Sequence, residues 1–225
     1  MNLSKSFEFF DPALCKHWIH IIGCGSVGST VAELLTRHGL TDFMLYDFDE
    51  VKRHNVVNQI FRDKDVRKAK VEALSQIMME INPEVNLKLK PEGWTQGCSL
   101  DGYVFLCVDD IELRAKIVKE NRFNNRVKAM FDFRTGLTDA QHFAADWSSP
   151  ESKKIFLETM GFSHEEAALN QQMSACNVSL CVAPTVRLVA NVGVVNFINF
   201  LKGNHMYKQI SMDAFNFEKG IDAVG

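Results

Sequence analysis

The sequence predicts an α/β fold: a Rossmann-like, mostly parallel sheet flanked by helices, with a smaller C-terminal portion that contains antiparallel strands. Two observations support this prediction. Between residues 17 and 133, apolar strand-like runs alternate with amphipathic helical patterns, and this alternation is typical of parallel sheets built from strand–helix–strand units. The first of these units also has a glycine-rich turn between its strand and its helix, a feature of sheets that bind nucleotides.

The remaining elements are assigned from apolar periodicity, in chain order. The expected strands cover 17–23, 42–47, 85–89, 101–110, 127–133 and 142–146, the expected helices cover 26–37, 66–81, about 111–121, 150–175 and 183–201, and a closing hairpin covers 206–217. We expect residues 1–16 to form an N-terminal arm or helix, packed on its own domain or on a second subunit. Residues 17–136 form the nucleotide-binding unit, and residues 137–225 form a crossover region, a helix and closing strands of the same domain.

Each glycine of the turn has a physical reason. Gly23 permits the tight turn, Gly25 lets the backbone approach a phosphate, and Gly28 lets the helix pack closely on the strand. Ser26 and Val27 begin the helix, where free N–H groups and the positive end of the helix dipole favour an anion. An acid about 20 residues further on hydrogen-bonds a ribose hydroxyl in such folds, and Asp47 has this place in the sequence. The unit therefore predicts a nucleotide site.

Composition excludes several classes of function. A chain of 225 residues with 46% apolar residues forms one large or one and a half domains, and its net charge of −3 gives no reason to expect nucleic-acid binding. The start has no signal peptide, and asparagines break the longest apolar stretch, Val189–Leu201, so we expect no membrane span. The six cysteines include no CxxC pair, which argues against a structural zinc and favours a cytoplasmic protein with reduced thiols.

Four further features indicate which nucleotide is bound: Asp47-Phe48-Asp49, the His54–Gln59 segment, Lys70 at a helix, and Val108-Asp109-Asp110 after a strand. The carboxyl ends of parallel strands converge on one crevice, so these side chains can share a site. A ribose-binding acid, a phosphate-facing lysine and a metal-facing aspartate suit ATP with Mg²⁺ better than NAD. An NAD- or FAD-dependent oxidoreductase remains an alternative, because a lone glycine motif is common to both classes.

At this point the motifs resemble a known family. They are GCGSVG (23–28), LYDFDEVKRHNVVNQ (45–59), DVRKAKVEAL (65–74), INPEV (81–85) and FLCVDDIELR (105–114). Together they are similar to the ThiF/MoeB/HesA adenylyltransferases, whose fold is shared with ubiquitin-activating enzymes. The resemblance implies ATP-dependent adenylation of the C-terminal carboxylate of a small ubiquitin-like or sulfur-carrier protein. It also implies a homodimer, because the family typically builds its site beside a two-fold interface.

The resemblance also implies roles for single residues. Asp47 binds ribose, Lys70 and Asn55 contact phosphate, and Asp109 holds Mg²⁺. The expected nucleotide-binding set is Gly23, Gly25, Ser26, Val27, Gly28, Asp47, Asp49, Asn55, Asn58, Lys70, Val108 and Asp109, and the expected catalytic set is Lys70, Asp109, Arg134 and Cys176. For Arg134 the alternative is a salt bridge to Asp132, and for Cys176, a candidate thioester carrier, the alternative is an inert structural cysteine.

The chain also departs from the family pattern. Asn58 stands where the family usually has an arginine, and Arg53 or Arg62 is the candidate replacement for that charge. The family commonly borrows an arginine from the N-terminal region of a partner subunit, whereas no arginine precedes Arg37 here. These departures leave a second hypothesis open, in which the chain is a non-catalytic scaffold or partner subunit with the same fold.

Overall fold

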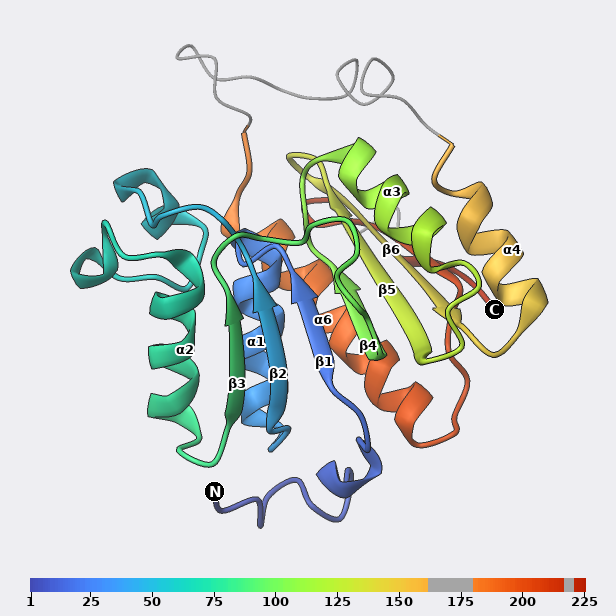
Figure 1. The fold of residues 1–225 in the computed structure, drawn as a ribbon, viewed down its shortest axis with the longest axis horizontal. Helices are drawn as coiled ribbons and strands as arrows, with labels where there is room; N and C mark the ends of the chain where they lie inside the picture. The colour runs from blue at the N-terminus through green and yellow to red at the C-terminus, as the bar shows by residue number, and fades with distance from the viewer. Residues whose placement is uncertain (162–179, 217–220) are drawn as a thin grey trace.

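The computed structural model describes residues 1–161, 180–216 and 221–225. These residues form an eight-stranded sheet with the order β3-β2-β1-β4-β5-β6-β7-β8 (Figure 1). The strands are β1 (Ile19–Ile22), β2 (Asp42–Tyr46), β3 (Asn86–Lys90), β4 (Gly102–Leu106), β5 (Val127–Thr135), β6 (Asp139–Asp146), β7 (Gln209–Asp213) and β8 (Ile221–Val224). β1 to β5 pair in parallel, and β6, β7 and β8 continue the sheet in antiparallel pairs. The predicted fold class is confirmed.

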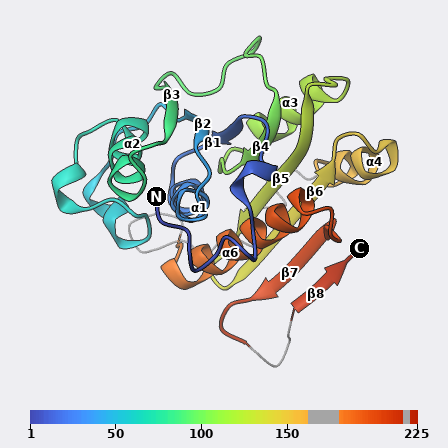
Figure 2. The same ribbon diagram turned by 90° about the horizontal axis from the view of Figure 1, so that it is seen from below.

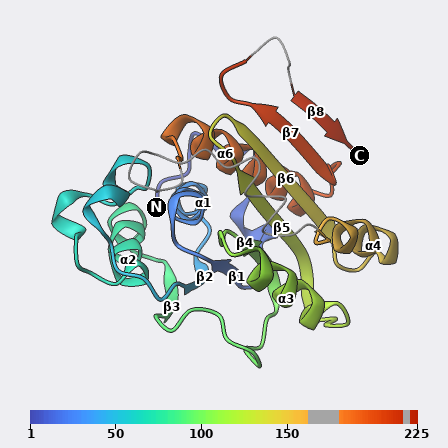
Figure 3. The same ribbon diagram turned by 90° about the horizontal axis from the view of Figure 1, so that it is seen from above.

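Helices cover both faces of this sheet. The described helices are α1 (Ser26–Arg37), α2 (Lys70–Ile81), α3 (Ile111–Asn121), α4 (Pro150–Glu158) and α6 (Ala183–Leu201), with short 3₁₀ turns at Pro12–Leu14, Arg53–Val57 and Asp63–Asp65. α1, α2 and α6 lie on one face, and α3 and α4 lie on the other (Figure 3). The chain changes faces between β3 and β4, so β1 and β4 are neighbours at the topological switch point, where ligands bind in open α/β sheets.

The central strands β1 and β4 are buried on both faces, which explains their continuous apolar runs, whereas β3 at the edge of the sheet is partly exposed. Phe105 of β4 belongs to the core under α1, α2 and α6, whereas Val104 and Leu106 on the same strand belong to the core under α3 and α4. The first core is rich in aromatic rings: Phe197 of α6 meets Phe105 and Phe131 edge-on, with ring centroids 5.1 and 5.2 Å apart. This packing holds the strand ends that carry the site in fixed positions.

The start of α2 differs from the prediction. The helix begins at Lys70 and not near residue 66. Arg67 has a φ of 76°, a left-handed conformation that no helix interior accepts. Two hydrogen bonds hold residues 67 and 68 against the segment after β2, from Arg67 N to the Val51 carbonyl at 2.9 Å and from Val51 N to the Lys68 carbonyl at 2.8 Å. Lys70 therefore occupies the first helical position beside the strand ends.

The C-terminal portion also differs from the prediction in its boundaries. The predicted helix over 150–175 is α4, which ends at Glu158, and 162–175 lies outside the described residues. The predicted hairpin over 206–217 is wrong in its second strand, because β7 pairs with β8 at 221–224. Beyond α6, the pair β7–β8 extends the sheet (Figure 2).

The predicted helix over 183–201 is confirmed as α6, but the expectation that no stretch is long and apolar enough to span a membrane is wrong by length and composition. α6 is a continuous helix of 19 residues, and among the described residues it is long and apolar enough to cross a membrane by length and composition. Its asparagines stay inside the helix: Asn191 donates to the Arg187 carbonyl, and Asn196 donates to the Tyr207 carbonyl. Half of the apolar window is buried inside the protein, where α6 packs on α1, β5 and β6.

The N-terminal arm packs on its own domain. Leu3 and Pro12 lie against Gly39 at the end of α1, and Phe10 is buried. The amino group of Met1 lies 2.8 Å from a carboxylate oxygen of Glu84. The arm is thus an extension of the sheet domain in this chain.

Candidate functional site

The glycine turn connects β1 to α1 at the switch point. Gly23 has a φ of +92°, and a Cβ there would lie 2.7 Å from the Cys107 carbonyl oxygen. A Cβ on Gly28 would lie 1.8 Å from the Gly23 carbonyl oxygen, whereas one on Gly25 would meet nothing within 4 Å. Gly23 and Gly28 are therefore required by the packing of the turn itself. The open space beside Gly25 is a cradle for a ligand.

The first turn of α1 faces this cradle with unused donors. Gly25 is the N-cap residue and makes no side-chain hydrogen bond to the helix, so the first N–H groups, from Ser26 onward, lack a side-chain acceptor. The N-terminus of a helix combines such N–H groups with the positive end of the dipole, and this combination binds phosphate. The geometry fits a nucleotide phosphate at the cradle.

Asp47 lies directly beside the turn, at the carboxyl end of β2. Its two carboxylate oxygens accept hydrogen bonds from the backbone N–H of Cys24 at 2.7 Å and of Asp49 at 2.9 Å. Burial raises the pKa of the Asp47 carboxyl, and the nearby Lys70 ammonium and the two N–H donors oppose this shift. The two backbone bonds fix the carboxylate next to the glycine turn, as a ribose-binding acid requires.

Lys70 joins this cluster from the start of α2. Its ammonium nitrogen lies 2.7 Å from Asp49 Oδ2 and 3.8 Å from Asp47 Oδ1, and its side chain is almost buried. The structure thus brings together a cation and two carboxylates that lie 21 to 23 residues apart in the sequence. A phosphate at the cradle would compete with the carboxylates for this ammonium.

The loop after β4 forms the other side of the turn. Val108 follows the residue that contacts Gly23, and Asp109 is exposed. Among the described residues no group of three or more metal-ligating side chains is present. A magnesium ion at Asp109 would therefore need ligands from its substrate or from water.

Arg114, which is not among the predicted site residues, fixes this loop. The side chain is buried on α3; its Nη2 donates to the Val108 carbonyl and, at 3.3 Å, to the Phe133 carbonyl. Its Nε lies 2.9 Å from Asp132 Oδ1, an ionic contact without hydrogen-bond geometry. One feature of the sequence does indicate that Arg114 is buried: it lies three residues after Ile111, on the apolar face of the helical pattern.

Arg134 shares Asp132 with Arg114. Its Nε donates to Asp132 Oδ2 at 2.7 Å, and its Nη2 donates to the Thr159 carbonyl at 2.9 Å. The guanidinium lies over the ring of Phe143, 4.3 Å from its centroid. The alternative of a salt bridge to Asp132 is present, and these bonds tie β5 to the end of α4. A contact of Arg134 with substrate stays a prediction.

The segment after β2 holds the two predicted asparagines. Asn55 accepts from the Lys52 N–H at 2.8 Å, and Asn58 donates to the Cys181 carbonyl at 3.3 Å. The two arginines considered as replacements for the missing charge are paired on the surface, Arg53 with Asp63 at 3.5 Å and Arg62 with Glu80 at 3.1 Å.

Cys176 lies outside the described residues. Among the described thiols, Cys24 lies within the glycine turn and Cys107 packs against it, and burial raises the pKa of both. A thiol whose pKa is raised is a poor nucleophile, so these two cysteines serve packing.

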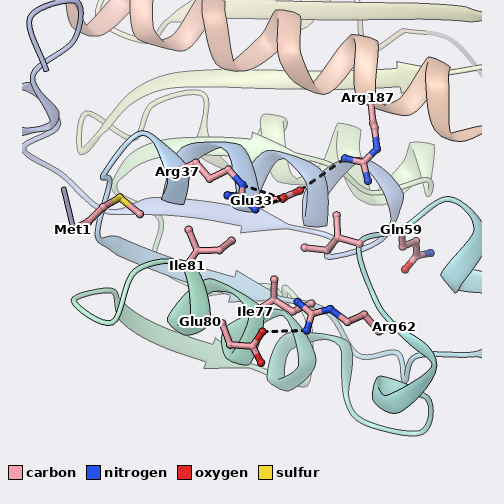
Figure 4. Close-up of a pocket in the computed structure, with 10 residues that line it drawn as sticks. Met1, Glu33, Arg37, Gln59, Arg62, Ile77, Glu80, Ile81 and Arg187 are labelled. Carbon is pink, nitrogen blue, oxygen red and sulfur yellow. Dashed lines mark hydrogen bonds and ion pairs between the residues drawn. The ribbon is translucent and has the colours of Figure 1, made fainter. Parts of the chain in front are cut away.

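A separate cleft of about 620 Å³ lies between α1, α2 and α6 (Figure 4). Its charged residues pair among themselves: Glu33 lies between Arg37 and Arg187, and Glu80 faces Arg62. None of the predicted nucleotide-binding or catalytic residues among the described part of the chain lines this cleft. The predicted site is instead the cluster formed by Gly25, Asp47, Asp49 and Lys70.

The fold and this cluster define a Rossmann-like α/β protein with a glycine turn at the switch point and an acid at the carboxyl end of β2. The particular family follows from comparison with known proteins. The chain belongs to the ThiF family, whose model matches residues 12–220.

Similar sequences include ubiquitin-like modifier-activating enzyme 5 of Drosophila virilis, 31% identical over an alignment of 146 residues that covers 55% of this chain and 35% of the relative. The protein with the same name from Arabidopsis thaliana is 43% identical over 70 residues, 31% of this chain and 16% of the relative. The matches therefore span about a third or less of these relatives.

Similar folds include a crystal structure of E. coli MccB with ATP, at a TM-score of 0.71 and 17% identity. The match covers 93% of this chain and 64% of that one. A structure of PaaA has a TM-score of 0.67 and 16% identity, over 93% of this chain and 64% of that one. At these identities the likeness supports the fold alone.

Proposed function

We propose that the chain catalyses the ATP- and Mg²⁺-dependent adenylation of the C-terminal carboxylate of a small ubiquitin-like or sulfur-carrier protein. The observation that carries this proposal is the cluster of Asp47, Asp49 and Lys70 beside the open cradle at Gly25. Family membership supports it, as do relatives named ubiquitin-like modifier-activating enzymes. ATP supplies the α-phosphate that the carboxylate attacks, with pyrophosphate as the leaving group.

The residues of the cluster have distinct tasks in this proposal. The N–H groups at the start of α1 hold a phosphate, and Asp47 holds the ribose. Lys70 exchanges its carboxylate partners for phosphate oxygens and neutralises charge that develops as pyrophosphate leaves. Asp109 is the proposed ligand for Mg²⁺, which would neutralise further phosphate charge.

Pyrophosphate exchange into ATP tests the activity, measured with the full chain and with small proteins or peptides that end in Gly-Gly. We expect exchange that depends on the carrier and on Mg²⁺. Lys70→Met and Asp109→Ala should abolish exchange and leave the fold intact by circular dichroism. Lys68→Met is the matched control, because Lys68 binds Asp65 and Gln76 outside the cluster. Absence of exchange with every carrier overturns the proposal.

Thioester transfer to Cys176 is the second part of the proposal. Some family members carry a thioester-forming cysteine in the corresponding region. We expect Cys176→Ala to leave AMP formation intact and to abolish a thiol-sensitive adduct between chain and carrier. An unchanged adduct on non-reducing gels refutes this role for Cys176.

The second candidate function is that of a non-catalytic partner subunit. Asn58 favours it, because an arginine usual in the family is replaced by an amide that bonds the Cys181 carbonyl. The ammonium of Lys70 is also already paired with the carboxylates of Asp47 and Asp49. This candidate predicts ATP binding without exchange, and exchange by the chain alone excludes it.

A further inference from the structure

The cleft between α1, α2 and α6 lies apart from the proposed nucleotide site, and the proposed function leaves it unused. Its volume of about 620 Å³ is in the range of ligand-binding pockets, about 300–1,000 Å³. Its walls come from the three helices and from the segment that precedes α2 (Figure 4). The charges and the apolar side chains of these walls indicate what the cleft can bind.

One carboxylate on α1 is shared by arginines from two helices. Arg37 donates from Nε and Nη2 to Glu33 Oε1, at 3.0 and 2.9 Å. Arg187 of α6 is held less closely, because its Nη1 lies 3.8 Å from Glu33 Oε2, beyond hydrogen-bond distance. The Arg187 side chain is 52% exposed. Within the described part of the chain, Glu33 therefore leaves the hydrogen-bond donors of Arg187 available to a ligand.

The α2 side of the cleft repeats this arrangement. Glu80 lies between two cations, with Arg62 Nη1 3.1 Å from its Oε2 and Lys64 Nζ 3.4 Å from its Oε1. The ammonium of Met1, which also lies at the cleft, is paired with Glu84 and adds no excess charge. In both places one carboxylate serves two cations, so positive charge is in local excess although the whole chain carries −3. This excess favours an anionic partner.

Isoleucines lie between the two groups of charges. Ile77 and Ile81 of α2 face the cleft between the charges of α1 and those of the α2 side (Figure 4), and Ile60 also lines it. A phosphate polymer such as RNA offers no aliphatic group to this surface. An acidic peptide that also carries aliphatic side chains offers carboxylates to the arginines and apolar surface to the isoleucines.

We propose that this cleft binds an acidic segment of a partner protein, with carboxylates on Arg62 and Arg187 and an aliphatic side chain against Ile77 and Ile81. Guanidinium groups bind carboxylates in charge-assisted pairs, and burial of the aliphatic group adds a hydrophobic contribution. A second copy of the chain is a poorer occupant, because a two-fold axis through the cleft brings the same patch of both copies together. Like charges would then face each other, which is unfavourable.

Fluorescence anisotropy with the full chain and a labelled, capped peptide of alternating glutamate and leucine tests the proposal. We expect the peptide to bind, and we expect its Kd to rise as added salt screens the charges. Arg62→Ala and Arg187→Ala should each raise the Kd about 2-fold to 5-fold. Arg62→Glu combined with Arg187→Glu should raise it at least about 10-fold.

Two peptides and one variant serve as matched controls. The peptide with lysine in place of glutamate should not bind, and the peptide with serine in place of leucine should bind more weakly than the parent. Arg122→Glu reverses an exposed arginine at the end of α3, on the opposite face of the sheet, and should leave the Kd unchanged. Circular dichroism checks that every variant is folded, and the two alanine variants decide if the double reversal does not fold.

Three outcomes overturn the proposal. The first is a wild type that does not bind the glutamate peptide, or binds it no better than the lysine peptide. The second is a Kd in the double reversal within about 2-fold of the wild type, or alanine variants equal to the wild type. The third is a wild-type dimer in sedimentation that the double reversal converts to a monomer, because a second copy would then occupy the cleft. None of these measurements depends on pyrophosphate exchange, so this proposal and the adenylation proposal can fail separately.

Discussion

Removal of the buried charge at Asp132 should strongly destabilise the fold. The Asp132 side chain is 0% exposed and lies between the guanidinium groups of Arg114 and Arg134, whose side chains are 6% and 15% exposed. Asp132→Asn keeps the size of the side chain but leaves two largely buried cations without their shared anion. Breaking a buried ion pair in this way costs about 3–5 kcal/mol. Because about 1 kcal/mol shifts the melting temperature of a domain of this size by roughly 2–4 °C, we expect a fall of about 6–20 °C.

Urea unfolding followed by circular dichroism measures this loss. The matched control is Asp63→Asn, because the pair between Arg53 and Asp63 has side chains that are 86% and 77% exposed. An exposed pair contributes about 0–1 kcal/mol, so the control should unfold close to the wild type. If Asp132→Asn lies within about 1 kcal/mol of the wild type, or if both variants lose equally, the reasoning about burial is refuted.

Two further predictions concern the glycine turn and a buried histidine. Gly28→Ala should unfold the turn, because its Cβ would lie 1.8 Å from the Gly23 carbonyl oxygen. Gly25→Ala should fold normally and lose ATP affinity, since its Cβ projects into open space. Thermal melts measure the first effect and calorimetry the second, and a stable Gly28→Ala refutes the packing argument. Burial lowers the pKa of His142 to about 3, below the value of about 6.5 in the unfolded chain. Between these two values the unfolded chain binds a proton that the folded chain does not. The free energy of unfolding should therefore fall by up to about 1.4 kcal/mol per pH unit as the pH drops from 6.5 toward 3. In urea unfolding measured from pH 4 to 7, the free energy of unfolding of His142→Gln should change less with pH than that of the wild type. An equal dependence on pH in both proteins would contradict the assignment.

Much of the site could be predicted from the sequence because parallel strands share one functional edge. The site residues come from three different elements: Gly23 follows β1, Asp47 follows β2, and Lys70 begins α2. The switch point brings these elements together. What could not be predicted depends on contacts between distant segments. Arg67 adopts the left-handed conformation although it is not a glycine, so the sequence pattern places the start of α2 too early. The anion that binds Arg114 comes from β5, and no local pattern links it to α3.

Boundaries near the C-terminus were predicted less well for the same reason. Alternation predicts β7. Its partner β8 follows after a gap in the pattern and pairs with the edge of β7 that faces away from β6. The long apolar helix α6 was predicted with its correct bounds. Its asparagines hydrogen-bond the backbone carbonyls of Arg187 and Tyr207, and these contacts, which composition does not show, let them lie within a long apolar helix.

The contact between Gly23 and Cys107 has a consequence for the biosynthesis of the protein. The glycine turn leaves the ribosome early, but the backbone that supports it, at the end of β4, is synthesised 84 residues later. At translation rates of about 5–20 residues per second, this interval lasts about 4 to 17 s. Until β4 has been synthesised, the edge of β1 that pairs with β4 in the complete fold has no partner strand. A nascent chain in this interval cannot hold a nucleotide at the native turn, and its exposed strand edge is a point where chaperones or misfolding can act.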